Sequence, residues 1–306
     1  MSTRLAAVSA TPGSLTRLAY RFSMRGRSQF DLPLLFCLIG LLFGLQACEP
    51  TLLMSRAQTA AAIARQVNWE PQDFDTKSFL LRLYLPAVRR QNSQVTIYIE
   101  SDGRSHVNRW ATSDPTPVDP IGLRLAAAKN SQASAYIARP CQYTLERDAA
   151  RCHPAYWTNG RYDERVLTAT SQAVDHIKSL FKARQVVLVG YSGGGAVAAL
   201  LAARRNDVTL LVTVAANLDT EYWVNELKVG HLKGSLNPAD FGRQLRRQRQ
   251  IHFVGEDDKR VSPNVARSYV AKVDPTLIGS IRLIKDADHD CCWEDLWPSL
   301  SQGIIP

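Results

Sequence analysis

The stretch "VVLVGYSGGGAVAALLAARR", residues 186–205, decides the fold that the rest of the chain is expected to adopt. It begins with an apolar, β-branched run that is typical of a strand buried on both faces. It ends in an alanine- and leucine-rich run closed by two arginines, where positive charge stabilises a helix. Between them, the spacing Gly190-x-Ser192-x-Gly194 predicts a turn so tight that only hydrogen atoms fit beside the serine. Such a turn pushes the hydroxyl out of the sheet, so Ser192 is predicted to be a nucleophile.

A serine hydroxyl needs a base to take its proton, and the base needs an acid that holds it in one tautomer. When the nucleophile lies on such a turn, the acid and then the base follow it in the chain. Three of the six histidines follow Ser192, and these are His231, His252 and His289. The second falls inside a predicted strand and the first inside a long connection. His289 lies in a polar loop after the last predicted strand, and it is therefore the predicted general base.

Two adjacent acidic residues follow a predicted strand in "IHFVGEDDKRVSP", residues 251–263. Both Asp257 and Asp258 qualify by position as the acid of the triad. The spacing Gly255-x-x-Asp258-x-x-Val261 places the second carboxylate at the apex of the turn, ahead of the next expected helix. Asp258 is therefore the predicted acid, and Asp257 is the alternative.

Apolar runs alternate with helical patterns along most of the chain, which predicts an α/β fold with a mostly parallel central sheet and helices on both faces. Sites in such sheets lie at the carboxyl ends of the strands. The stretch 217–241 is too long for a simple connection and is long enough to form a small cap. The expected strands are 79–85, 95–99, 135–138, 186–189, 210–214, 251–254 and 281–284. The expected helices are 121–129, 164–183, 194–205, 238–247, 263–272 and 293–300.

Three motifs in this order resemble the α/β-hydrolase superfamily over about residues 77–300: strand–GYSGG–helix, GxxDxxV at 255–261 and DxxH at 286–289. The chain also resembles an exported proteobacterial group of these proteins, through "ARPCQY" at 138–143 and "SLNPADF" at 235–241. The resemblance implies the same serine, aspartate and histidine as the residue pattern, and it implies no cofactor.

The resemblance also implies an oxyanion hole, the pair of N–H donors that binds the negative oxygen of the reaction intermediate. The superfamily takes one donor from the residue after the nucleophile, here Gly193, and one from a loop after an early strand. That loop is "YIESDGRSHVNRW", residues 98–110, in which Asp102-Gly103 stands where many members carry His-Gly. Gly103 is the expected second donor, with the backbones of Asp102 and Arg104 as alternatives. The Asp102 carboxylate is expected to bring an unfavourable negative charge near the oxyanion.

The expected function is an exported serine hydrolase, esterase- or lipase-like, that cleaves carboxylic esters or related small acyl substrates through an acyl-enzyme. Two alternatives remain, because the fold does not choose among them: an acyltransferase with the same triad, and a non-catalytic binding lipoprotein. Loop aromatic residues are expected either to line an apolar acyl site or to pack in the core and rim. They are Trp110, Tyr156, Trp157, Tyr222 and Trp223.

Residues 1–47 have the pattern of a secretory signal rather than of a folded domain. Arg25 and Arg27 precede the apolar stretch "LPLLFCLIGLLFGLQA", residues 32–47, and small residues close it. This stretch is shorter than the roughly 20 residues that span a bilayer. Nothing signal-like precedes Met24, which is an alternative start.

The four residues that end at Cys48 resemble the bacterial lipobox, in which the cysteine is lipidated and becomes the new N-terminus. The chain is therefore expected to be a lipoprotein attached to the membrane through Cys48, facing the periplasm at the outer membrane. Ordinary secretion and an uncleaved anchor are the alternatives. Residues 48–76, with a short helix in "RAQTAAAIARQ", are expected as a tether to a hydrolase domain over 77–306.

Charge and cysteine content narrow the remaining function classes. The net charge is +9, and residues 1–47 hold five Arg and one Asp, which leaves +5 for the rest. No basic block interleaves with aromatic residues, so nucleic-acid binding is not expected. Export predicts a disulfide between Cys141 and Cys152. The adjacent Cys291 and Cys292 are expected either to form a vicinal disulfide or to stay reduced, and no histidine joins any of them at the spacing of a metal site.

Overall fold

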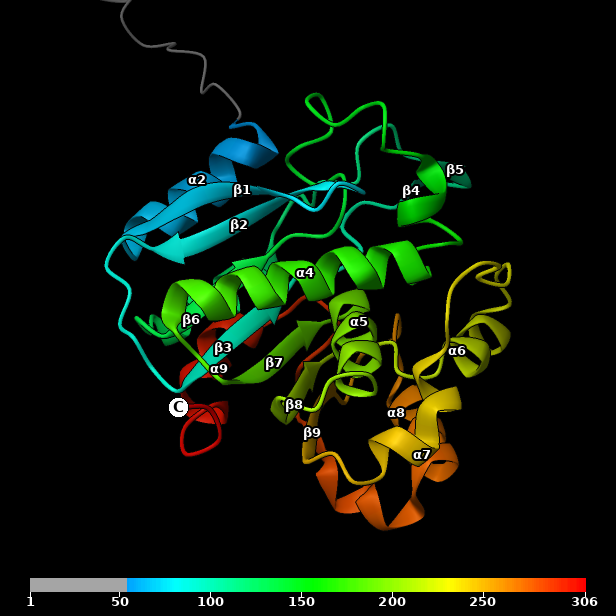
Figure 1. Cartoon of the computed structure of the whole chain (residues 1–306). Coiled ribbons are helices and arrows are strands. Elements are labelled where there is room, and N and C mark those ends of the chain that lie inside the picture. Colours follow the sequence, from blue (N-terminus) through cyan, green and yellow to red (C-terminus); the bar gives the residue numbers. More distant parts are fainter. Residues whose placement is uncertain (1–53) are drawn as a thin grey trace, which may run out of the picture. The chain divides into compact units, whose positions relative to one another are not determined.

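Eight strands form the central sheet of the computed structural model, which describes residues 54–306 (Figure 1). In sheet order they are β1 (Trp69–Asp75), β2 (Leu80–Pro86), β6 (Ser134–Ile137), β3 (Gln94–Ile99), β7 (Gln185–Tyr191), β8 (Val208–Val214), β9 (Gln250–Gly255) and β10 (Ile281–Ile284). The six strands from β6 to β10 run parallel, whereas β1 and β2 pair antiparallel at one edge. The predicted strands and the mostly parallel sheet are confirmed, and β1 is an addition.

Helices cover both faces of the sheet. One face carries α4 (Glu164–Phe181), α5 (Gly193–Ala202) and α8 (Pro263–Val273), and the other carries α2 (Arg56–Gln66), α3 (Ile121–Lys129) and α9 (Trp293–Leu300). Figure 1 shows α4 and α5 in front of the strands and α9 behind them. Along β7, alternate residues contribute to the two hydrophobic cores, one on each face of the sheet. Burial on both faces explains why this strand is apolar throughout.

Shorter elements complete the domain. The expected helix 238–247 is a 3₁₀ turn, η2 (Pro238–Phe241), followed by α7 (Gly242–Leu245). The long stretch 217–241 carries α6 (Thr220–Leu227), which contacts α8. A small hairpin of β4 (His106–Val107) and β5 (Trp110–Ala111) follows β3, and short 3₁₀ turns lie at η1 (Pro154–Trp157) and η3 (Pro275–Ser280). Within residues 54–306, no helix has both the length and the hydrophobicity to cross a membrane.

The segment expected as a tether is partly folded, which corrects the predicted domain boundary. The expected short helix is present as α2, but its side chains Ala60, Ile63 and Ala64 are buried in the core on one face of the sheet. β1 pairs with β2 along its whole length, and Trp69 is only 2% exposed. The proline and the charged residues in "WEPQDFD" do not form the apolar pattern from which the other strands were predicted. An edge strand such as β1 tolerates both kinds of residue. The domain therefore begins near residue 55 rather than at 77.

The targeting predictions fall outside the described residues. The signal peptide at 1–47, the alternative start at Met24 and the lipidated Cys48 all lie in this N-terminal part. They remain predictions from the sequence.

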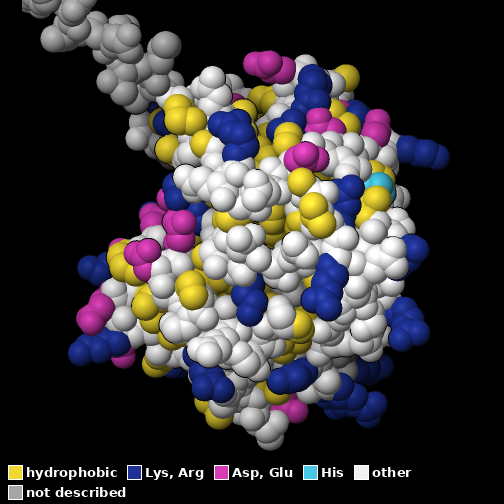
Figure 2. All heavy atoms as spheres, turned by 90° about the vertical axis from the view of Figure 1, so that its left-hand side faces the viewer, with side chains coloured by type: hydrophobic (Ala, Val, Ile, Leu, Met, Phe, Trp, Pro, Cys, Tyr) yellow, Lys and Arg dark blue, Asp and Glu magenta, His cyan; other side chains and the backbone are white. Residues whose placement is uncertain are grey.

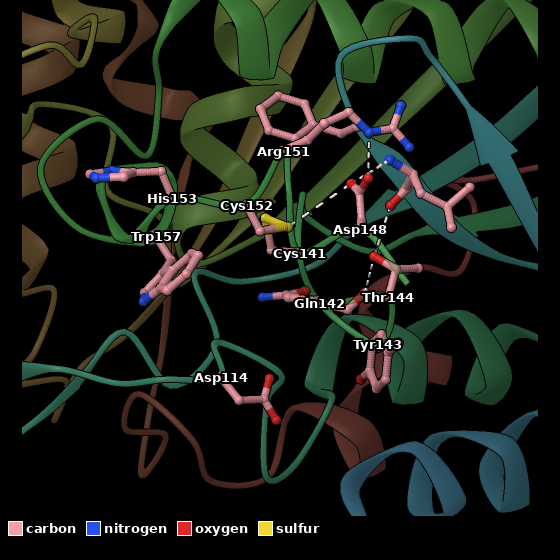
Figure 3. Close-up of a disulfide and its surroundings, with 12 residues drawn as sticks. Asp114, Cys141, Gln142, Tyr143, Thr144, Asp148, Arg151, Cys152, His153 and Trp157 are labelled. Carbon is pink, nitrogen blue, oxygen red and sulfur yellow. Dashed lines mark hydrogen bonds and ion pairs between the residues drawn. A yellow bond between two sulfur atoms is a disulfide. The ribbon is translucent and has the colours of Figure 1, made fainter. Parts of the chain in front are cut away.

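The structure links Cys141 to Cys152 in a disulfide, with a Cα–Cα separation of 5.7 Å (Figure 3). The bond closes a loop between the end of β6 and η1. Inside this loop, Asp148 accepts a hydrogen bond from the backbone N–H of Leu80 at 2.8 Å and pairs with Arg151. The loop is thereby attached to the sheet. The structure also records Cys291 and Cys292 as a disulfide pair.

Basic side chains are distributed over the surface in the view of Figure 2 rather than gathered in one patch. Acidic side chains lie among them mainly in the upper and left parts of this view.

Removing the Trp69 side chain tests whether α2 and β1 belong to the domain. Trp69→Ala in the full chain is expected to lower the free energy of unfolding by about 3–5 kcal/mol, because it leaves a cavity in the core. Urea unfolding followed by circular dichroism measures this loss. Arg65→Ala, on the exposed side of α2, is the control and should change it by less than about 0.5 kcal/mol. Equal stability of the two variants would show that residues 55–75 are only a tether.

Candidate active site

The turn between β7 and α5 is closed by direct contact between backbones. A Cβ added at Gly190 would collide with the backbone of Gly194 and Gly195, and one added at Gly194 would collide with the carbonyl of Ile99. Both glycines are therefore required by packing. Ser192 itself has φ 51° and ψ −121°, a conformation that non-glycine residues rarely adopt. The surrounding packing holds this strained residue, as the motif predicts for a reactive serine.

Three predicted side chains meet at the carboxyl ends of the strands. The Ser192 Oγ lies 3.0 Å from His289 Nε2, and His289 Nδ1 lies 2.8 Å from Asp258 Oδ2. The other carboxylate oxygen of Asp258 accepts the backbone N–H groups of Arg260 and Val261 at 2.8 Å each. These contacts fit a histidine that donates from Nδ1 to the carboxylate and presents Nε2 to the hydroxyl as an acceptor.

The structure separates these residues from the other candidates. The side chain of Asp258 is fully buried beside the histidine, whereas Asp257 is exposed. His252 lies in the core, where its ring contacts Thr213 Oγ1 at 2.8 Å, and His231 is exposed at the edge of the cavity described below. Asp258 and His289 are thus the acid and the histidine that the fold brings to Ser192.

The His289 loop is held from both sides by the core. Tyr191, next to the nucleophile, donates its hydroxyl to the His289 carbonyl at 2.8 Å. The indole Nε1 of Trp293 donates to the same carbonyl at 3.0 Å. His289 is only 7% exposed, so its ring has a fixed position beside the serine.

The candidate for the second oxyanion donor differs from the expected residue. The N–H of Gly103 donates to Ser101 Oγ at 3.2 Å, and the N–H of Arg104 donates to the Pro115 carbonyl at 3.0 Å. Neither is available to a substrate. The N–H groups of Gly193 and Asp102 have no acceptor among residues 54–306. Asp102 therefore replaces Gly103 as the candidate, because the bend at Gly103 directs its N–H back toward the loop.

The Asp102 carboxylate lies against Gly193, but its negative charge is not isolated. Arg139 Nη1 binds Oδ1 at 3.0 Å, and Arg161 Nη1 binds Oδ2 at 2.8 Å. The hydroxyl of Tyr162 donates to Oδ2 at 3.0 Å. Burial alone would raise the pKa of Asp102, but the charges of Arg161 and Arg139 outweigh it and hold the pKa below its usual value. The expected unfavourable charge is thus paired with two guanidinium groups.

A cavity of about 1090 Å³ opens above the triad. It is lined by Ser192 and His289, by the loop after β3 with the β4–β5 hairpin, and by residues 229–232 of the long stretch before η2. Of the aromatic residues proposed from the sequence, only Trp223 lines it; Trp110, Tyr156, Trp157 and Tyr222 do not. The cavity is large enough for a small organic ligand.

Comparisons with solved structures identify the fold. The esterase domain of a Rhodothermus marinus protein matches with a TM-score of 0.50 at 15% identity, covering 76% of this chain and 95% of that one. An esterase of Pyrococcus furiosus matches with a TM-score of 0.53 at 11% identity, covering 77% and 90%. An alpha-beta serine hydrolase homologue from Coxiella burnetii matches with 0.50 at 14% identity, covering 76% and 93%.

The chain has the α/β-hydrolase fold. No family model and no curated protein matches its sequence. At these identities the structural matches establish the fold alone. The chemistry is therefore inferred from the contacts among Ser192, His289 and Asp258.

Sequence reasoning gave no role to Arg139 and Arg161. Arg139 lies within the "ARPCQY" signature, directly after the predicted strand at 135–138. A charged residue at the carboxyl end of a strand could have marked it as part of the site. Arg161 lies in a polar loop, far in sequence from Asp102, and no local pattern marks it. Among residues 54–306, no group of three or more His, Cys, Asp or Glu side chains is arranged to hold a metal ion.

The two adjacent aspartates allow a matched test of the site. We expect Ser192 to react with a fluorophosphonate probe, and Asp258→Asn to slow this reaction roughly 10³- to 10⁴-fold, because the histidine loses its orienting acid. Asp257→Asn removes an exposed carboxylate and should leave the rate within about twofold. The second-order rate constant of labelling measures both. Equal slowing by the two substitutions would contradict the assignment of Asp258.

The buried His252 gives a pH-dependent stability. Burial lowers its pKa to about 3 from 6.5, so the folded state resists a proton that the unfolded chain accepts. Stability from this group is present above pH 6.5 and is lost toward pH 3, by about 1.4 kcal/mol per pH unit. Urea unfolding between about pH 7 and pH 5 should show a shallower pH dependence in His252→Gln than in the unsubstituted protein. Identical slopes would mean that folding does not lower the pKa of His252.

Proposed function

We propose that this protein is a serine hydrolase that cleaves carboxylic esters through an acyl-enzyme. The observation that carries the proposal is the chain of contacts from Ser192 Oγ to His289 Nε2, at 3.0 Å, and from His289 Nδ1 to Asp258 Oδ2, at 2.8 Å. Ser192 and His289, at one end of this series of contacts, line a cavity that is open to a substrate. Esterases among the structural neighbours are consistent with this chemistry.

The first half of the reaction transfers the acyl group to the enzyme. Ser192 Oγ attacks the ester carbonyl while His289 Nε2 takes the hydroxyl proton, and Asp258 stabilises the resulting imidazolium. The carbonyl oxygen becomes negative and is bound by the N–H groups of Gly193 and Asp102, which are the proposed oxyanion hole. The C–O bond then breaks, and His289 gives its proton to the leaving alcohol.

The second half releases the acid. Water takes the place of the alcohol, loses a proton to His289 and attacks the acyl carbon. The same two N–H groups bind the second oxyanion. When the bond to Ser192 Oγ breaks, the serine recovers its proton from the histidine, and the free enzyme returns.

Covalent labelling tests this function. A fluorophosphonate should modify the full chain at Ser192, and hydrolysis of 4-nitrophenyl butyrate should fall roughly 10⁴- to 10⁶-fold in Ser192→Ala and in His289→Ala. Ser105 also lines the cavity and touches a histidine, His106, at 3.1 Å, so Ser105→Ala is a matched control that should keep the label on Ser192. Labelling that persists in Ser192→Ala would contradict the nucleophile. A folded protein with neither labelling nor turnover would favour a binding protein.

The proposed place of action is the periplasmic side of the outer membrane, through a lipid on Cys48. The support for this is the sequence around residues 32–48 alone. Radiolabelled palmitate should enter the unsubstituted protein and not Cys48→Ser. Equal incorporation in both would mean that Cys48 carries no lipid.

A further inference from the structure

A buried charge cluster beside the proposed oxyanion hole has more positive than negative groups. Arg139, Arg161 and Tyr162 all bind the Asp102 carboxylate, and the side chains of the two arginines are only 4% and 8% exposed. No other acidic side chain in residues 54–306 forms a salt bridge with either arginine. The cluster of two guanidinium groups and one carboxylate therefore keeps one unbalanced positive charge.

The pKa shifts of the groups in this cluster agree with a net positive charge. The pKa of Asp102 is lowered, so its carboxylate is ionised at neutral pH. Burial alone would lower the pKa of Arg161, but the charge of Asp102 raises it instead. Burial and the neighbouring carboxylate keep the Tyr162 hydroxyl neutral, because they raise its pKa. A buried charge without a partner is unfavourable, and in folded proteins it is usually matched by an opposite charge.

One guanidinium nitrogen of Arg161 is not paired within the described part of the chain. Its Nε donates to the Thr158 carbonyl at 2.5 Å and its Nη1 to Asp102, whereas its Nη2 has no acceptor among residues 54–306. Arg161 lines the same cavity as Ser192. These two fixed contacts orient the planar guanidinium group, so its remaining N–H groups are preorganised to bind a carboxylate.

The wall of the cavity near Arg161 is also basic. Arg104 and Arg109 lie in and around the β4–β5 hairpin, line the cavity and are exposed. His106 lies on the same hairpin and lines the same cavity, and its pKa is lowered first by burial and then by the charge of Arg161. The apolar Val229 and Leu232 line the same cavity. Its two further acidic side chains, Asp119 and Asp290, are already paired with Arg124 and Arg260. The lining therefore combines cationic side chains near Arg161, unpaired within residues 54–306, with apolar ones.

We propose that the site takes esters that carry a carboxylate, which Arg161 binds with the help of Arg104 and Arg109. This inference rests on the proposed hydrolase function and narrows its substrate class. The apolar lining at Val229 and Leu232 contacts the hydrocarbon part of the substrate, and the substrate's negative charge balances the excess positive charge of the cluster. Arg161 would bind a carboxylate in the same way whether it belongs to the acyl part of the ester or to its leaving group.

Matched pairs of esters test the proposal and separate the two sides. On the acyl side, the mono-4-nitrophenyl ester of glutaric acid is compared with neutral 4-nitrophenyl butyrate. On the leaving-group side, 4-butyryloxybenzoate is compared with its neutral methyl ester. We expect kcat/KM to be at least about 10-fold higher for the anionic member of one pair, after correction for uncatalysed rates. Raising the salt from about 0.05 M to about 0.5 M should reduce this preference.

Arginine variants assign the preference to residues. The double substitution Arg104→Gln with Arg109→Gln should reduce the ratio of anionic to neutral kcat/KM at least about threefold. Thermal unfolding first shows whether Arg161→Gln folds. In the folded variant, the ratio of anionic to neutral kcat/KM should fall further. Arg247→Gln removes an exposed arginine that does not line the cavity, and it is the control that keeps the ratio.

The outcomes distinguish this proposal from the hydrolase function on which it rests. Neutral esters hydrolysed as fast as anionic ones in both pairs would overturn the carboxylate proposal and leave the hydrolase intact. A preference that survives the double substitution, or that Arg247→Gln reduces equally, would overturn its assignment to this wall. A protein that hydrolyses none of the four esters contradicts both proposals.

Discussion

The rest of the site depends on the contact between the backbones of β7, α5 and β3 at Gly190 and Gly194. At these positions the chains approach so closely that no Cβ fits, and the carbonyl of Ile99 lies against Gly194. This approach forces Ser192 into its strained conformation and places the loop after β3 beside the first turn of α5. The proposed nucleophile and the proposed oxyanion hole thus both depend on one packing contact.

Parallel strands gather the remaining groups at the same edge. Strands β3, β7 and β9 are aligned, so the loops at their carboxyl ends meet, and Asp258 reaches His289, which follows β10. The core contributes to this precision, because Tyr191 and Trp293 bind the His289 carbonyl. A triad that spans nearly 100 residues of sequence is held by hydrogen bonds to buried side chains.

Two carboxylates hold the loop after β3, each through several contacts. Glu100 accepts the N–H groups of Ser101 and of Gly122 at the start of α3, together with the Tyr136 hydroxyl. Burial raises the pKa of Glu100, although these hydrogen bonds oppose the shift. Asp102 is held by ion pairs with Arg139 and Arg161. A charged residue is tolerated beside the proposed oxyanion hole because its own charge is more than neutralised.

The sequence by itself determined the fold class, the turn at Ser192, the histidine that follows it and a pair of adjacent aspartates as candidates for the acid. Each depends on local rules: apolar runs for buried strands, glycines where a Cβ would clash, and the order of acid and base along the chain. The tertiary structure decided between Asp257 and Asp258, moved the oxyanion donor from Gly103 to Asp102 and drew residues 55–75 into the domain. It also assembled the arginine cluster from Asp102, Arg139 and Arg161. These features depend on contacts between segments distant in sequence and on the direction of single N–H groups, and neither leaves a periodic signal in the chain.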